Sequence, residues 1–66
     1  MKIQLNGETR DIPDSSTAQD LVEFLELSGK RLAMEVNQEI VPRTTYTAFQ
    51  LKQGDRVEIV HAIGGG

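Results

Sequence analysis

Few residues of this 66-residue chain have side chains suited to chemistry. His61 is the only histidine and cysteine is absent, so a metal site would lack a second nitrogen ligand and any sulfur ligand. The serines stand beside the ends of an expected helix, where capping explains them; they are Ser15, Ser16 and Ser28. Nothing in their spacing pairs one of them with His61 as a nucleophile and a base. We therefore expect no catalytic residues and no metal ligands.

The group that remains is the carboxylate of Gly66, which follows Gly64 and Gly65. A carboxylate anion is a poor electrophile, so another protein would have to activate it. Transfer of AMP from ATP would neutralise the anion and install a leaving group, which a sulfur or nitrogen nucleophile could then displace. The three glycines are not a phosphate-binding loop, because neither a helix nor a lysine follows them.

A run of glycines costs backbone entropy on ordering, so it does not serve stability. It is also the thinnest peptide available, and residues 63–66 would reach about 13–14 Å when extended. We expect residues 1–62 to form the folded domain and residues 63–66 to be a flexible tail that can enter a narrow slot. The alternative is a frayed terminus or a cloning remnant.

Composition limits the partners. Ten acidic and seven basic residues give a net charge of −3, and no basic cluster points to nucleic acid. No apolar run approaches the roughly 20 residues of a membrane span, and the first residues do not resemble a signal peptide. We expect a cytoplasmic protein that binds neither nucleic acid nor membrane.

The first strands are indicated by alternation and by turn residues. Residues 1–5 alternate apolar and polar side chains, with the apolar ones on one face. Asn6-Gly7 tolerates the positive φ angles of a type I′ turn, so a second strand should return through residues 9–12 and end at Pro13.

A helix follows, and Thr17 with Asp20 has the spacing of a capping box; Ser16 with Gln19 is an equally allowed cap. Ser28-Gly29 should end the helix. Its outer face should carry residues such as Glu23 and Glu26. Its apolar stripe, which we expect in the core, comprises Ala18, Leu21, Val22 and Leu25, widened by Phe24 and Leu27.

The second half of the chain predicts three more strands. Residues 32–36 alternate, Ile40-Val41 is a short edge strand before Pro42, and the last strand runs through residues 57–62. Val57 and Ile59 should face the core, and Glu58, Val60 and Ala62 the other side. Residues large enough to cover an open end of the core are Tyr46, Phe49 and Leu51.

The first and last strands contain no proline, which favours placing both in the centre of a sheet. A right-handed crossover through the helix permits this order. The expected fold is α+β, a β-grasp in which a mixed four- to five-stranded sheet packs on one helix. The other face of the sheet is then open to solvent or to a partner.

Several motifs together resemble the ThiS family, the ubiquitin-like sulfur carrier proteins of thiamin biosynthesis. They are Ile3-x-Leu5-Asn6-Gly7, the helix start at Thr17, Val36-Asn37-x-x-Ile40-Val41-Pro42-Arg43, Gly54-Asp55 and the final Gly65-Gly66. The resemblance implies that an adenylyltransferase of the ubiquitin-activating type adenylates Gly66 with ATP. Sulfur derived from a cysteine desulfurase converts Gly66 to a thiocarboxylate, which donates sulfur to thiazole synthase for the thiazole phosphate ring. It also implies a protein cosubstrate that is not an enzyme and binds no cofactor itself.

The resemblance assigns the remaining roles along the tail. Gly64 and Gly65 thread into the partner, and Ile63 is the last side chain before the slot. Val60 and Ala62 are candidate partner contacts, or else merely cover the sheet. Family members often carry Ala at the position of Gly64, and Glu58 is an unexpectedly polar residue on the open face. Two alternatives stay open: a carrier like the small subunit of molybdopterin synthase, and a β-grasp interaction module that undergoes no covalent change.

Overall fold

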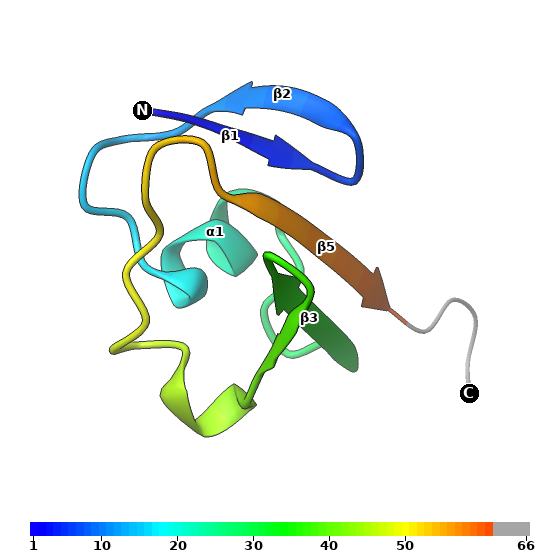
Figure 1. Cartoon of the computed structure of the whole chain (residues 1–66). Coiled ribbons are helices and arrows are strands. Elements are labelled where there is room, and N and C mark those ends of the chain that lie inside the picture. The colour runs from blue at the N-terminus through cyan, green and yellow to red at the C-terminus, as the bar shows by residue number, and fades with distance from the viewer. Residues whose placement is uncertain (62–66) are drawn as a thin grey trace.

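The computed structural model describes residues 1–61. Its elements are β1 (Lys2–Leu5), β2 (Glu8–Asp11), α1 (Ala18–Phe24), β3 (Leu32–Val36), β4 (Glu39–Val41), a 3₁₀ turn (Arg43–Thr45) and β5 (Arg56–His61). The sheet order is β2-β1-β5-β3-β4, with β1 and β5 parallel and the other pairs antiparallel (Figure 1). The predicted mixed sheet with the first and last strands at its centre is confirmed.

Two tight turns set the register of the outer strands. Asn6 and Gly7 have φ angles of 50° and 85°, as expected for a type I′ turn between β1 and β2. Asn37 and Gln38 have φ angles of 53° and 69° and join β3 to β4 in the same way. Because turns of this type match the twist of the strands, each hairpin can form from local sequence alone.

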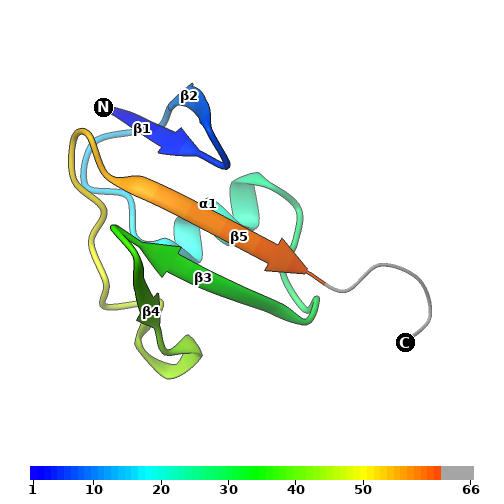
Figure 2. The same cartoon turned by 45° about the vertical axis from the view of Figure 1, so that its right-hand side comes forward.

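The core lies between α1 and one face of the sheet, and the other face is open (Figure 2). Most of the strand residues predicted to face inward are buried, whereas Met1 and Leu32 are partly buried against the core. Ile3, Met34 and Val57 are among the largest fully buried side chains, together with Leu21 of α1. Burial of such side chains contributes about 1.5–3 kcal/mol each. The alternation read from the sequence therefore identified the correct face of each of these strands.

The start of the helix is also as predicted. Thr17 Oγ1 accepts a hydrogen bond from the Asp20 amide at 3.1 Å, and the Asp20 carboxylate accepts one from the Thr17 amide at 2.9 Å. Ser16, the alternative cap, instead donates its hydroxyl to the Pro13 carbonyl at 2.6 Å. The capping box of Thr17 is thus the one that forms.

The end of the helix was predicted wrongly. α1 stops at Phe24, and Glu26 adopts a left-handed φ of 57°. The amides of Glu26 and Leu27 then bond back to the carbonyls of Glu23 and Val22, both at 3.0 Å, which is a Schellman motif. The stop leaves Phe24 49% exposed, not in the core as expected, whereas Leu25 and Leu27 pack against the core from beyond the helix.

The irregular segment between β4 and β5 covers an end of the core, as predicted. Tyr46 and Leu51 are buried, and Phe49 packs against the core with partial exposure. The segment also serves the helix, because the carbonyls of Phe49 and Tyr46 accept hydrogen bonds from the amides of Ala18 and Gln19 at 2.9 and 3.1 Å. These amides have no partner within the helix itself.

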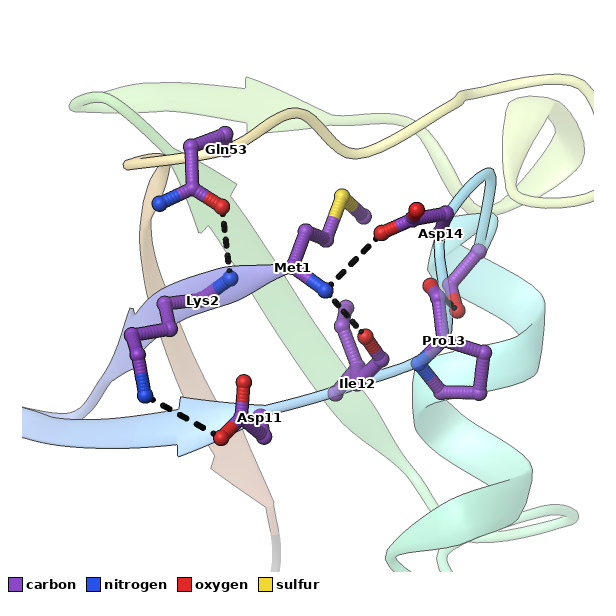
Figure 3. A network of polar contacts seen from close by, with 8 residues as sticks. Met1, Lys2, Asp11, Ile12, Pro13, Asp14 and Gln53 are labelled. Atoms are coloured by element: carbon purple, nitrogen blue, oxygen red, sulfur yellow. Dashed lines mark hydrogen bonds and ion pairs between the residues drawn. The ribbon is translucent and has the colours of Figure 1, made fainter.

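A polar network holds the beginning of β1 (Figure 3). The nitrogen of Met1 donates to the Ile12 carbonyl at 2.7 Å and to Asp14 at 2.9 Å, and the Lys2 side chain pairs with Asp11 at 3.1 Å. The Lys2 amide donates to Gln53 at 2.8 Å. Since β1 and β5 are parallel, this network lies at the opposite end of the sheet from His61 (Figures 1 and 2).

Candidate functional site

The candidate site begins where the central strand β5 leads toward the glycines. On one side β5 pairs with β3 along its length, from Val36 opposite Val57 to Leu32 opposite His61. On the other side it pairs with β1 only at Arg56 and Val57. The second half of β5 therefore has a strand neighbour on one side alone, and something else must hold its free side.

The side chain of Asn6 takes the place of the missing strand. Its amide nitrogen donates to the Ile59 carbonyl at 3.2 Å, and its oxygen accepts from the Ile59 amide at 2.9 Å. On the other side, at the start of β5, Asn37 uses its backbone as well as its side chain: its backbone N–H donates to the Arg56 carbonyl at 2.7 Å, and its side-chain oxygen accepts from the Arg56 amide at 3.0 Å. Two turn asparagines thus extend the ladders of the central strand.

From the sequence, Asn6 and Asn37 were assigned turn positions only, so these contacts with β5 were missed. The available signal was that an asparagine begins each of the two tight turns, at a position where glycine would also satisfy the positive φ. The choice of asparagine at both turns is explained by its side chain, which can offer a donor and an acceptor together.

The open face beside β5 carries apolar and acidic groups. Val60 lies on this face opposite Ala33 and is 71% exposed, as the sequence predicted. Ile40 of β4 is 66% exposed and shares a cross-strand row with Glu35 and Glu58. The two glutamates are directly opposite, and like charges in such a pair are destabilising. Within residues 1–61 neither of them forms an ion pair.

His61 is partly buried at the end of β5. Its Nδ1 atom is buried and has no hydrogen-bond partner among the described residues. These residues also contain no group of three or more histidine, cysteine or acidic side chains placed to hold a metal, and no helix among them is long and apolar enough to cross a membrane.

The remaining predicted site residues lie outside the described part of the chain. They are Ala62, Ile63, Gly64, Gly65 and Gly66. The proposed division between a domain of residues 1–62 and a tail of residues 63–66 therefore stays a prediction. Of the predicted site, the structure places only Val60, on the open face of the strand that leads toward these residues.

Comparison with known proteins extends over the whole chain. The model of the ThiS family matches residues 3–66. A sulfur carrier protein ThiS from Bacillus subtilis is 38% identical over 97% of this chain and 98% of that protein. The crystal structure of a thiamine biosynthesis protein (ThiS) from Geobacter metallireducens has a TM-score of 0.84 and 28% identity, covering 100% of both chains. The predicted β-grasp fold and the resemblance are both confirmed.

Larger proteins also contain a similar segment. A thiazole synthase from Paramagnetospirillum magneticum is 41% identical over 100% of this chain, which corresponds to 20% of that protein. The chain thus spans about a fifth of the length of the thiazole synthases that it matches.

Proposed function

The chain belongs to the ThiS family of sulfur carriers for thiamin biosynthesis, and we propose that the carboxylate of Gly66 is the group that carries the sulfur. The observation that supports this most directly is the direction of β5. The central strand of the sheet ends its described part at His61, five residues before Gly66, and at the end of the sheet opposite the start of β1 (Figure 2). The folded domain would then hold the glycines at this end of the sheet, where a partner enzyme can reach them.

The chemistry requires a partner that supplies ATP. An adenylyltransferase of the ubiquitin-activating type joins the Gly66 carboxylate to AMP and releases pyrophosphate. A cysteine desulfurase supplies the sulfur as a persulfide, whose outer sulfur attacks the adenylate carbonyl and displaces AMP, so that the carbon–oxygen bond to AMP breaks and a carbon–sulfur bond forms. A thiol reductant then cleaves the sulfur–sulfur bond of the resulting acyl disulfide, which supplies the two electrons and leaves a thiocarboxylate on Gly66. Thiazole synthase accepts this sulfur for the thiazole phosphate ring, so the carrier is a cosubstrate and not an enzyme.

The open face of the sheet is the proposed docking surface for these enzymes. Val60 is exposed there on the strand that leads to the tail, and we extend the contact to Ala62 and Ile63. Gly64 and Gly65 then thread into the active site of the partner, where the absence of side chains permits a narrow entrance. Asn6 supports this role by holding the Ile59 backbone, one residue before Val60.

The decisive experiment is the intact mass of the protein after incubation with ATP, cysteine, a thiol reductant, and the adenylyltransferase and desulfurase of the same organism. We expect a gain equal to the mass difference between sulfur and oxygen. The modified protein should then support thiazole formation by thiazole synthase, which a carrier for molybdopterin synthesis would not do.

The matched control is a variant that lacks Gly66. It should have the same circular dichroism spectrum and thermal midpoint as the parent, because among residues 1–61 the buried core spans Ile3 to Ile59, and its mass should not change in the mixture. An unmodified parent protein in the complete mixture would contradict a carrier function and favour a module that acts without covalent change.

A further inference from the structure

β4 is the outermost strand beyond β3, so one of its sides has no strand neighbour (Figure 2). The hydrogen bonds at the β3–β4 turn show which backbone groups point to that side. The amide of Asn37 donates to Arg56 of β5, so the backbone groups of Asn37 face β5. Because successive residues of a strand face alternate neighbours, those of Val36 and Met34 face β4.

This alternation exposes the backbone of Ile40. The register pairs Val36 with Glu39 and Met34 with Val41, so the backbone groups of Glu39 and Val41 bond to β3. The N–H and C=O of Ile40, between them, must point away from the sheet. Within residues 1–61 these two groups have no hydrogen-bond partner.

The rest of this edge is closed. Pro42 has no N–H, and its carbonyl already accepts hydrogen bonds from the amide and the hydroxyl of Thr45, at 2.9 and 2.7 Å. Proteins usually protect an edge strand by shortness, proline or charge. Here shortness and proline limit the edge to a single residue, but that residue, Ile40, has a large apolar side chain that is 66% exposed.

A pocket of about 360 Å³ lies beside the exposed edge. Its lining includes Ile40, Val41 and Phe49, which are apolar, and the charged residues Glu39, Lys52 and Asp55. A strand added to β4 would direct alternate side chains to the two faces of the sheet. One set would face this pocket, which Ile40 also lines, and the other set would lie on the open face of the sheet.

We propose that β4 binds an extended segment of a partner protein, which joins the sheet as an added strand through the N–H and C=O of Ile40. The segment would carry an apolar side chain for the pocket. A basic residue is also favoured, because the pocket holds two acidic residues, Glu39 and Asp55, against one basic residue, Lys52, and Glu35 lies opposite Ile40 on the open face. Main-chain hydrogen bonds supply the attraction in this mode of binding, and the pocket supplies selectivity. This inference does not depend on the chemistry of Gly66.

Substitution of Ile40 by proline tests the main-chain contact directly. The substitution removes the N–H that points away from the sheet. Edge strands accept proline at positions where the N–H would face solvent, so the hydrogen bonds between β3 and β4 should survive. Ile40→Ala is the matched control, because it removes most of the same side chain and keeps the N–H. A random peptide library displayed on phage is the probe, selected on the full chain and counter-selected on Ile40→Pro.

We expect selected peptides with basic and apolar residues that bind the parent and Ile40→Ala alike but bind Ile40→Pro about tenfold more weakly, the effect of losing one hydrogen bond. In the parent protein, the Ile40 amide should exchange rapidly with solvent when free and slowly with peptide bound. This second readout does not depend on the folding of the proline variant.

Three results would overturn the proposal. One is the absence of any peptide enriched on the parent over Ile40→Pro. Another is an equal loss of binding in both variants, which would indicate contact with the side chain and not with the strand edge. The third is concentration-dependent protection of the Ile40 amide without peptide, since that would make a second copy of this chain the occupant.

Discussion

The hydrogen bonds between Asn6 and Ile59 give a prediction whose size can be worked out. Asn6→Gly removes both bonds and keeps a residue that accepts the φ of 50°. Two such bonds contribute about 2 kcal/mol net. A chain of this length has a free energy of unfolding of about 3–10 kcal/mol, so the loss is a large fraction of it.

Urea unfolding measures this loss. With a slope of about 1 kcal/mol per molar urea for a small domain, the midpoint should fall by about 2 M. Gln38→Gly is the control for the entropy of an added glycine, because Gln38 also has a positive φ of 69° but its side chain forms no hydrogen bond within the described residues. Its midpoint should stay the same or rise.

Asn6→Asp separates the donor from the acceptor. It keeps an oxygen for the Ile59 amide but turns a second oxygen toward the Ile59 carbonyl, so we expect a loss at least as large as that of Asn6→Gly. Hydrogen exchange at the Ile59 amide should accelerate in both variants. If the Asn6→Gly midpoint moved by less than about 0.5 M with unchanged exchange, our account of how β5 is held would be refuted.

Two further predictions concern stability. Glu26→Gly should raise the free energy of unfolding by about 1 kcal/mol, because a left-handed φ costs a residue with a side chain more than it costs glycine. Thermal unfolding measures this gain, with Glu26→Ala as the control. An unchanged thermal midpoint in Glu26→Gly would show that the backbone of Glu26 is not strained. The pKa of Tyr46 is raised, because the effect of burial is larger than the opposing effect of the nearby positive charge of Arg43. In the unfolded chain the tyrosine has a pKa of about 10 and loses its proton above that pH, whereas the folded state keeps the proton. The free energy of unfolding should therefore fall as the pH rises above about 10. Tyr46→Phe should remove this part of the decline, and an identical alkaline slope in both proteins would contradict it.

Much of the fold follows from signals that act over a few residues. The strand faces follow from alternation, as with Ile3 and Val57, and the first hairpin from Asn6-Gly7. The helix end was wrong because Glu26, which gives no such signal, takes the left-handed position that glycine usually occupies. The prediction therefore placed the end at Gly29, several residues too late.

The open face shows the same limit. The sequence placed Val60 and Glu58 on that face, but not the cross-strand row in which Glu58, Glu35 and Ile40 are neighbours. Such a row depends on the order and register of three strands. The outward direction of the Ile40 backbone depends on them as well, and no local pattern encodes it.

The sequence by itself identified the carboxylate of Gly66 as the group for the proposed chemistry. A single histidine, no cysteine and a final run of glycines direct attention to the carboxylate of Gly66, and these are facts of composition that no fold can alter. Only the tertiary structure decided how β5 is held, because Asn6 and Ile59 are 53 residues apart and meet only when β1 and β5 lie side by side. Local preferences select strands and turns, whereas contacts between distant residues depend on which strands become neighbours.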